Sequence, residues 1–131
     1  MTSAAFAMVW NAHRMADGLI AAGFIPAAGR VAGDEARNCR RLSGYGYFIL
    51  LFGLLEAHVD RLFQDSRGDP AEFPFMRRVT EIYGPRTETS AFIGEFYAAR
   101  CDIAHGRYMD LGSIDTDGFA AMAARILGDG A

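Results

Sequence analysis

The chain lacks lysine altogether, because all 13 of its basic residues are arginine. With 16 acidic residues, its formal net charge is −3. A protein that coats nucleic acid without sequence preference needs a basic surface, and this charge balance argues against that class of protein. Arginine nevertheless binds phosphate groups through paired hydrogen bonds better than lysine does, so local phosphate contacts remain open.

The sequence also has little that favours β-structure. Valine and threonine are scarce, alanine is the commonest residue, and no segment alternates apolar and polar residues between tight turns. Alanine favours helix. The chain has 131 residues, of which 51% are hydrophobic, which suits one domain with a filled core. We therefore predict a single all-α domain over residues 1–131.

Features of metal, secretory and membrane proteins are equally sparse. Cys39 and Cys101 lack zinc-site spacing, and no cluster of carboxylates and histidines is evident, so we expect no metal and no cofactor. Arg14 and Asp17 interrupt the first apolar stretch, which argues against a secretory signal. The longest apolar run, residues 45–55, is about half the length of a membrane span. We expect a cytoplasmic protein with reduced thiols and no membrane partner.

Apolar residues at helical spacing, with turn residues between them, divide the chain into five helices. We expect helices at residues 3–23, 34–65, from 69 or 74 to 83, from 86–90 to 105, and 118–127. Ser43, Gly44 and Gly46 predict a kink or break near the middle of the second. Short connections between four main helices, followed by a short carboxyl-terminal helix, favour an antiparallel bundle.

Particular residues mark the expected helix ends. Ser3 and Gly23 are the expected caps of the first helix, and Gly106 is the expected residue after the fourth. Asp115 or Thr116 is the expected cap of the fifth. These residues are chosen because their side chains or backbone freedom satisfy groups that a helix leaves unpaired at its ends.

The segment RCDIAHG, residues 100–106, holds the arginine and histidine best suited to phosphate chemistry. Arg100 and His105 are five positions apart, roughly 140° around an ideal helix. They converge only if the helix ends or distorts at His105, or if a second subunit brings another copy. On spacing alone, a capping histidine and an arginine that reaches from the core to water explain the same residues.

The chemistry of this pair fits metal-independent cleavage of RNA by its own 2′-hydroxyl group. A histidine can take or give a proton near neutral pH. A nearby arginine can hold a phosphate and stabilise the charge that develops on it. His105 would then be the general base or acid, and Arg100 the phosphate clamp.

Two stretches together resemble the HEPN superfamily of small all-α domains. The apolar segment FILLFGLLEAHVDRLF, residues 48–63, precedes RCDIAHG, and HEPN domains carry an arginine, four to six residues and a histidine late in the domain. The resemblance covers roughly residues 46–108. It implies a homodimer whose Arg100 and His105 line a cleft at the subunit interface. It also implies a ribonuclease of the kind found in toxin–antitoxin pairs, anti-phage systems and RNA processing.

The resemblance also implies roles for neighbouring residues. Glu56 matches an acidic residue that several HEPN groups carry in the apolar helix. We expect it to orient or neutralise Arg100, since a buried guanidinium needs a partner; a surface ion-pair cluster on the same helix is the alternative. HEPN domains often have a polar residue directly after the arginine, where this chain has Cys101. Either Asp102 takes the polar role or the site is inactive.

Two functions therefore stay open. The first is a homodimeric, metal-independent endoribonuclease that acts on RNA, with an antitoxin or a nucleotidyltransferase as a candidate protein partner. Some HEPN toxins carry a tyrosine two places after the histidine that such a transferase modifies, whereas Tyr108 is three places after His105. The second is a catalytically inactive helical module that binds another protein, which the acidic charge and Cys101 favour.

The remaining basic and imidazole groups have plainer interpretations. Arg37, Arg40 and Arg41 form the densest basic patch, and Arg77 and Arg78 form a second. Both could follow an RNA backbone, and both could equally be solvated helix faces. The two histidines outside the motif, at positions 13 and 58, lie among apolar residues, where we expect packing or an interface rather than catalysis.

Overall fold

The computed structural model describes residues 4–22, 24–25, 29–30, 34–108, 111–112 and 114–129. The described residues form five α-helices: α1 (Ala4–Ala21), α2 (Asp34–Arg67), α3 (Phe75–Tyr83), α4 (Glu88–Ala104) and α5 (Thr116–Asp129). The prediction of an all-α helical bundle is confirmed. A single 3-10 turn, η1 (Pro70–Glu72), precedes α3. Two strands that the sequence did not predict, β1 (Phe24–Ile25) and β2 (Gly29–Arg30), pair antiparallel between α1 and α2.

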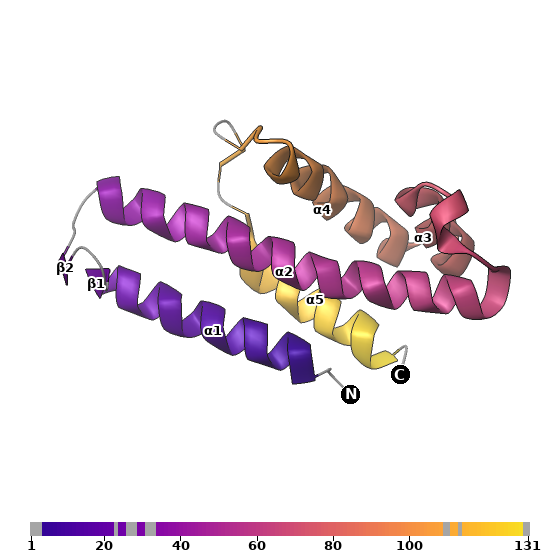
Figure 1. The fold of residues 1–131 in the computed structure, drawn as a ribbon, viewed down its shortest axis with the longest axis horizontal. Helices are drawn as coiled ribbons and strands as arrows, with labels where there is room; N and C mark the ends of the chain where they lie inside the picture. Colours follow the sequence, from indigo (N-terminus) through magenta and orange to yellow (C-terminus); the bar gives the residue numbers. More distant parts are fainter. Residues whose placement is uncertain are drawn as a thin grey trace.

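The central element of the bundle is α2 (Figure 1). Figure 1 shows α1 along one side of α2 and α4 along the opposite side, with α5 behind. The helices α1, α2, α4 and α5 alternate in direction, as expected for an antiparallel bundle. The shortest helix, α3, packs against α2 and α4 near the far end of α2. The carboxyl end of α4 and the outer face of α1 therefore lie on opposite sides of the molecule.

The hydrophobic core is built on the inner face of α2. Five side chains of this helix have no exposed surface, namely Phe48, Leu51, Phe52, Leu55 and Val59. The ring of Phe119 on α5 lies 4.9 Å from that of Phe48 and 5.8 Å from that of Phe52, between ring centroids. Aromatic rings at such separations pack favourably and bury large areas. This cluster fixes α5 against α2.

The predicted break in the middle of α2 is wrong, because α2 is one continuous helix from Asp34 to Arg67. Glycine inside a helix costs about 1 kcal/mol relative to alanine, which motivated the prediction. Burial of Tyr45 and Phe48, which are 3% and 0% exposed, offsets that cost.

By length and composition, residues Arg37–Arg67 of α2 could span a membrane. The apolar run at residues 45–55 did not indicate this, because it is only the central part of that segment. A core helix meets the same criterion, and the inner face of α2 forms the core described above. Packing within the protein accounts for the apolar residues on the inner face of α2, while Leu42 and Leu50 on its outer face are exposed.

The ends of the later helices agree with most of the predicted caps. Asp115 Oδ1 accepts a hydrogen bond from Gly118 N at 3.0 Å, so Asp115 caps α5. Asp69 caps only the turn η1, and α3 begins after Pro74. The carboxyl-terminal helix, α5, was predicted to be shorter than the four main helices. It has 14 residues, whereas α3, one of those four, has nine. Ser3 and Gly23 lie outside the described residues.

Candidate functional site

The last turn of α4 positions His105 at the boundary between helix and loop. Gly106 has a φ of +75° and donates through its backbone N–H to Ile103 O at 3.1 Å. Arg107 N donates to Asp102 O at 2.7 Å. This pair of bonds is the Schellman ending of a helix, which needs a residue with positive φ just past the cap. The prediction that Gly106 ends the helix is confirmed, and His105 is the cap residue with an exposed side chain.

Arg100 and Glu56 join α4 to α2. Arg100 Nε lies 3.0 Å from Glu56 Oε1, and their side chains are 34% and 24% exposed. The contact predicted between these two residues is therefore present. The alternative was a surface cluster of Glu56, Asp60 and Arg61 on α2, but Asp60 Oδ1 lies 2.9 Å from Arg78 Nε of α3. The carboxylate of Glu56 holds the guanidinium of Arg100 in one position, and part of the Arg100 side chain stays exposed to solvent.

Within one chain, Arg100 and His105 do not meet. Arg100 faces α2, whereas the His105 side chain is exposed at the end of α4. Among the residues that the structure describes, no hydrogen bond or ion pair involves the imidazole of His105. The separation matches the roughly 140° rotation that five helical residues impose. A substrate phosphate or a second subunit would have to bridge the two groups.

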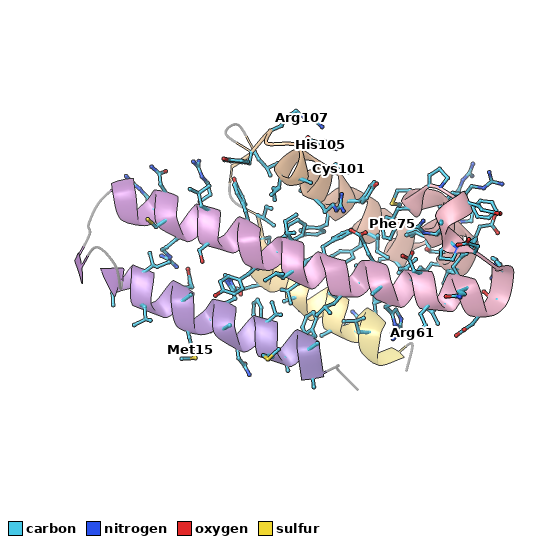
Figure 2. The ribbon with its side chains drawn as sticks, viewed as in Figure 1. Met15, Arg61, Phe75, Cys101, His105 and Arg107 are labelled. Atoms are coloured by element: carbon cyan, nitrogen blue, oxygen red, sulfur yellow. The ribbon has the colours of Figure 1, made fainter. Side chains whose placement is uncertain are left out.

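A second arginine stands beside His105. Arg107 Nε lies 3.3 Å from Asp102 Oδ1, so Asp102 is engaged across the turn that carries His105. Figure 2 shows Cys101, His105 and Arg107 grouped at the carboxyl end of α4. Sequence reasoning missed Arg107, although its position two residues after the histidine was visible. Asp102 thus orients a cation near the imidazole rather than standing alone.

Tyr97 adds a polar group between α2 and α4 that the sequence analysis did not single out. A hydrogen bond with the Cys101 side chain and burial raise the pKa of Tyr97, and Glu56 contributes in the same direction while Arg100 opposes it. Four side chains, from Tyr97, Arg100, Cys101 and Glu56, therefore form one interacting cluster. The spacing of Tyr97 and Cys101, four residues apart on one helix, could have revealed the contact.

The two other histidines are buried, as expected. His58 is 3% exposed, and burial, followed by the nearby charge of Arg61, lowers its pKa. His13 is 8% exposed and packs between Trp10 and Tyr47, with ring centroids 5.3 and 5.2 Å away. Neither residue contributes to the end of α4.

The two basic patches have different structural roles. Arg78 is bound within the protein, since its Nη1 donates to the carbonyl oxygens of Pro70 and Phe73 at 2.7 and 2.8 Å. Arg40 and Arg41, in contrast, line a polar pocket beside α1. Within the described part of the chain, no group of three or more His, Cys, Asp or Glu residues could hold a metal ion.

Comparison with known proteins yields no relative. No protein-family model, curated protein or solved structure matches this chain. Membership of the HEPN superfamily therefore remains a resemblance carried by residues 48–63 and 100–106.

Proposed function

We propose that this protein is a metal-independent endoribonuclease that uses Arg100 and His105 and acts as a homodimer on cytoplasmic RNA, as a toxin or an anti-phage component. The observation that carries the proposal is the Arg100–Glu56 contact at 3.0 Å, on the same end of α4 that exposes His105. It supplies a positioned, half-exposed cation about one and a half helical turns from a titratable group. That combination suits chemistry on a phosphodiester.

In the proposed reaction, the imidazole of His105 takes the proton from a ribose 2′-hydroxyl group. The 2′-oxygen attacks the adjacent phosphorus, and the bond from phosphorus to the 5′-oxygen of the next nucleotide breaks. The products are a 2′,3′-cyclic phosphate and a 5′-hydroxyl end, to which a proton returns. Arg100 stabilises the extra negative charge on the phosphate during the attack, because its guanidinium can donate several hydrogen bonds.

Glu56 has a positioning role in this scheme. It engages Nε of Arg100, which leaves the other N–H groups of the guanidinium as donors to a phosphate. A carboxylate beside the arginine also limits the rotamers that the long side chain can adopt, so less conformational entropy is lost when substrate binds. Arg107, held by Asp102, adds positive charge on the side of His105.

The outer face of α2 supports the proposed homodimer. Five exposed, uncharged residues follow one side of this helix, namely Leu42, Gly46, Leu50, Gly53 and Ala57, which we call the α2 strip. A Cβ added at Gly46 or Gly53 would meet nothing within 4 Å. The strip is about 22 Å long, and exposed apolar surface of this kind marks association sites. Because Glu56 borders it, a second copy seated there would bring two Arg100–Glu56 pairs to one interface.

The test is cleavage of a fluorescently labelled single-stranded RNA by purified protein in EDTA. We expect cleavage by the wild-type protein and a loss of about 10²- to 10⁴-fold in the His105→Gln variant. Arg86→Gln, in the exposed turn before α4, is the matched control for Arg100→Gln. Cleavage that requires added metal, or that survives His105→Gln unchanged, contradicts the mechanism.

A second candidate function is a catalytically inactive module that binds another protein through α1. Met8, Met15 and Leu19 are 68%, 71% and 50% exposed, and their spacing places them on one helical face together with exposed Ala12. Figure 2 shows Met15 on the side of α1 that faces away from α2.

Co-purification with the product of the adjacent gene distinguishes the two functions. If the protein is an inactive module, that product is retained by the wild-type protein and lost in Met15→Glu, and no variant cleaves RNA. If it is the proposed ribonuclease, Met15→Glu still cleaves RNA and His105→Gln does not.

A further inference from the structure

A pocket of about 550 Å³ lies on helices other than α4. It lies between the second half of α1, the first half of α2 and the start of α5. Four arginines line it, Arg14, Arg37, Arg40 and Arg41, together with His13. Figure 1 shows these parts of α1 and α2 side by side, at the end of the pair that is joined by β1 and β2.

The carboxylates of the pocket are already engaged. Asp17 accepts two hydrogen bonds from Arg40, at 2.8 and 2.9 Å, and this bonding lowers the pKa of Asp17. Asp115 caps α5 through Gly118 N. Asp117 lies 3.5 Å from Arg14. The three negative charges that line the pocket are therefore matched by partners, and the amino end of α5 is already complemented by its own acidic residues.

Two residues that line the pocket each have a buried nitrogen atom without a hydrogen-bond partner. His13 Nδ1 and Arg41 Nε are buried, and neither has a hydrogen-bond partner among the residues that the structure describes. His13 is more than nine-tenths buried, and Trp10 and Tyr47 hold its ring on both sides. Folded proteins rarely leave buried donors unsatisfied. A ligand that accepts hydrogen bonds would complete both groups once the side chains that cover these two nitrogen atoms move aside.

The donors define the chemistry of that ligand. Arginine can only donate, and His13 Nδ1 donates when it carries a proton. The two groups come from different helices, so the ligand must accept from more than one direction and carry negative charge. A phosphate group meets these requirements better than a planar carboxylate, since its oxygens are arranged tetrahedrally. The pocket is larger than one phosphate ion, which leaves room for the organic part of an ester.

We propose that this pocket binds a phosphate monoester, with its oxygens contacted by His13 and Arg41. The phosphate can belong to a nucleoside monophosphate or to the phosphorylated end of an RNA, and inorganic phosphate is the smallest probe of the same site. The proposal is independent of the ribonuclease function, because Arg100, Glu56 and His105 take no part in the pocket. Either proposal can therefore fail while the other stands.

The test is titration calorimetry of the full chain with inorganic phosphate, adenosine 5′-monophosphate and adenosine. We expect both phosphates to bind and adenosine not to bind. Arg41→Gln should weaken binding about tenfold or more, because charged hydrogen bonds to phosphate are lost. Arg86→Gln and His105→Gln should bind as the wild-type protein does. Titration of an RNA oligonucleotide with and without a 5′-phosphate then separates an RNA end from a free nucleotide.

A second measurement covers the case in which pocket variants fold poorly. In ¹⁵N-labelled wild-type protein, inorganic phosphate should shift the imidazole resonances of His13 and leave those of His58 in place. The proposal is overturned if no phosphate binds at millimolar concentration, if Arg86→Gln weakens binding as much as Arg41→Gln, or if the His13 resonances do not respond.

Discussion

The end of α4 and the α1–α2 pocket both combine arginine with histidine, but they are built in opposite ways. Arg100 and His105 are neighbours in sequence, and the helix then turns them about 140° apart. His13 and Arg41 are distant in sequence, and the packing of α1 on α2 brings both into one pocket. The first region exposes its imidazole to solvent and the second buries it. Closeness in sequence is therefore a poor guide to which arginine and histidine act on one ligand.

If the two regions have separate functions, substitutions should separate them completely. His105→Gln should lower the rate of RNA cleavage by about 10²- to 10⁴-fold, the usual contribution of a general acid or base. Arg41→Gln should leave the single-turnover cleavage rate unchanged, since Arg41 lies in the other region. Rapid-quench measurement of that rate checks both variants. Equal losses in the two variants would show that the regions form one functional site.

Association of two copies should matter only for the end of α4. Leu50→Glu places a charge in the α2 strip, where desolvating it on dimerisation is unfavourable. We expect a monomer in analytical ultracentrifugation and at least a tenfold loss of cleavage, with phosphate binding in the pocket unchanged. Ala98→Glu, on an exposed position of α4, is the control. A Leu50→Glu protein that cleaves RNA as a monomer removes the dimer from the mechanism.

The Arg100–Glu56 pair should contribute more to activity than to folding. Both side chains are partly exposed, so we expect Glu56→Gln to lower the free energy of unfolding by only about 1 kcal/mol. Cleavage should fall further than this, because Arg100 loses its orientation. Urea denaturation and steady-state kinetics on the same preparation give the two quantities. A variant that loses stability but keeps full activity assigns the pair a structural role alone.

The turn that carries His105 depends on Gly106. With φ at +75°, alanine at this position costs about 1–2 kcal/mol. Gly106→Ala should lower the melting temperature and also reduce cleavage, because the imidazole shifts with the turn. Phosphate binding by the pocket should not change. Gly18→Ala, at a helical position where a Cβ meets nothing within 4 Å, is the matched control and should be neutral or stabilising.

The smallest effect concerns the buried histidine on α2. Burial lowers the pKa of His58 below its ordinary value of 6.5 in the folded protein. The unfolded chain then binds more protons below pH 6.5, so the free energy of unfolding should fall as the pH drops from 6.5 toward the folded pKa. His58→Gln should flatten this dependence in denaturation curves between pH 5 and about 7. An unchanged slope would mean that other groups dominate.

Local chemistry explains which parts of the fold were predictable. Gly106 and Asp115 were identified because each satisfies backbone groups within a few residues of itself. The continuity of α2 was not predicted, because the burial of Tyr45 and Phe48 by distant parts of the chain outweighs the local cost of the glycines. The β1–β2 pair, with two residues in each strand, is too short to leave a pattern.

The two candidate sites also differ in whether the sequence predicted them. The Glu56–Arg100 contact was anticipated from a family resemblance together with the need of a guanidinium for a partner. The pocket was not, because His13 falls on an apolar stripe and Arg41 in a polar segment, and nothing local relates them. Only the register between α1 and α2, set by contacts such as Asp17 with Arg40, places them together.

Because α2 is one continuous helix, it connects the two regions rigidly. Arg41 and Glu56 are about 22 Å apart along the axis of this helix. One residue inserted between them would swing everything beyond it through roughly 100°, which would carry Glu56 away from α4 while the pocket stayed intact. During evolution this helix can accept exchanges of side chains along its length but not a change of length, and its residue count should be the trait that descendants share most strictly.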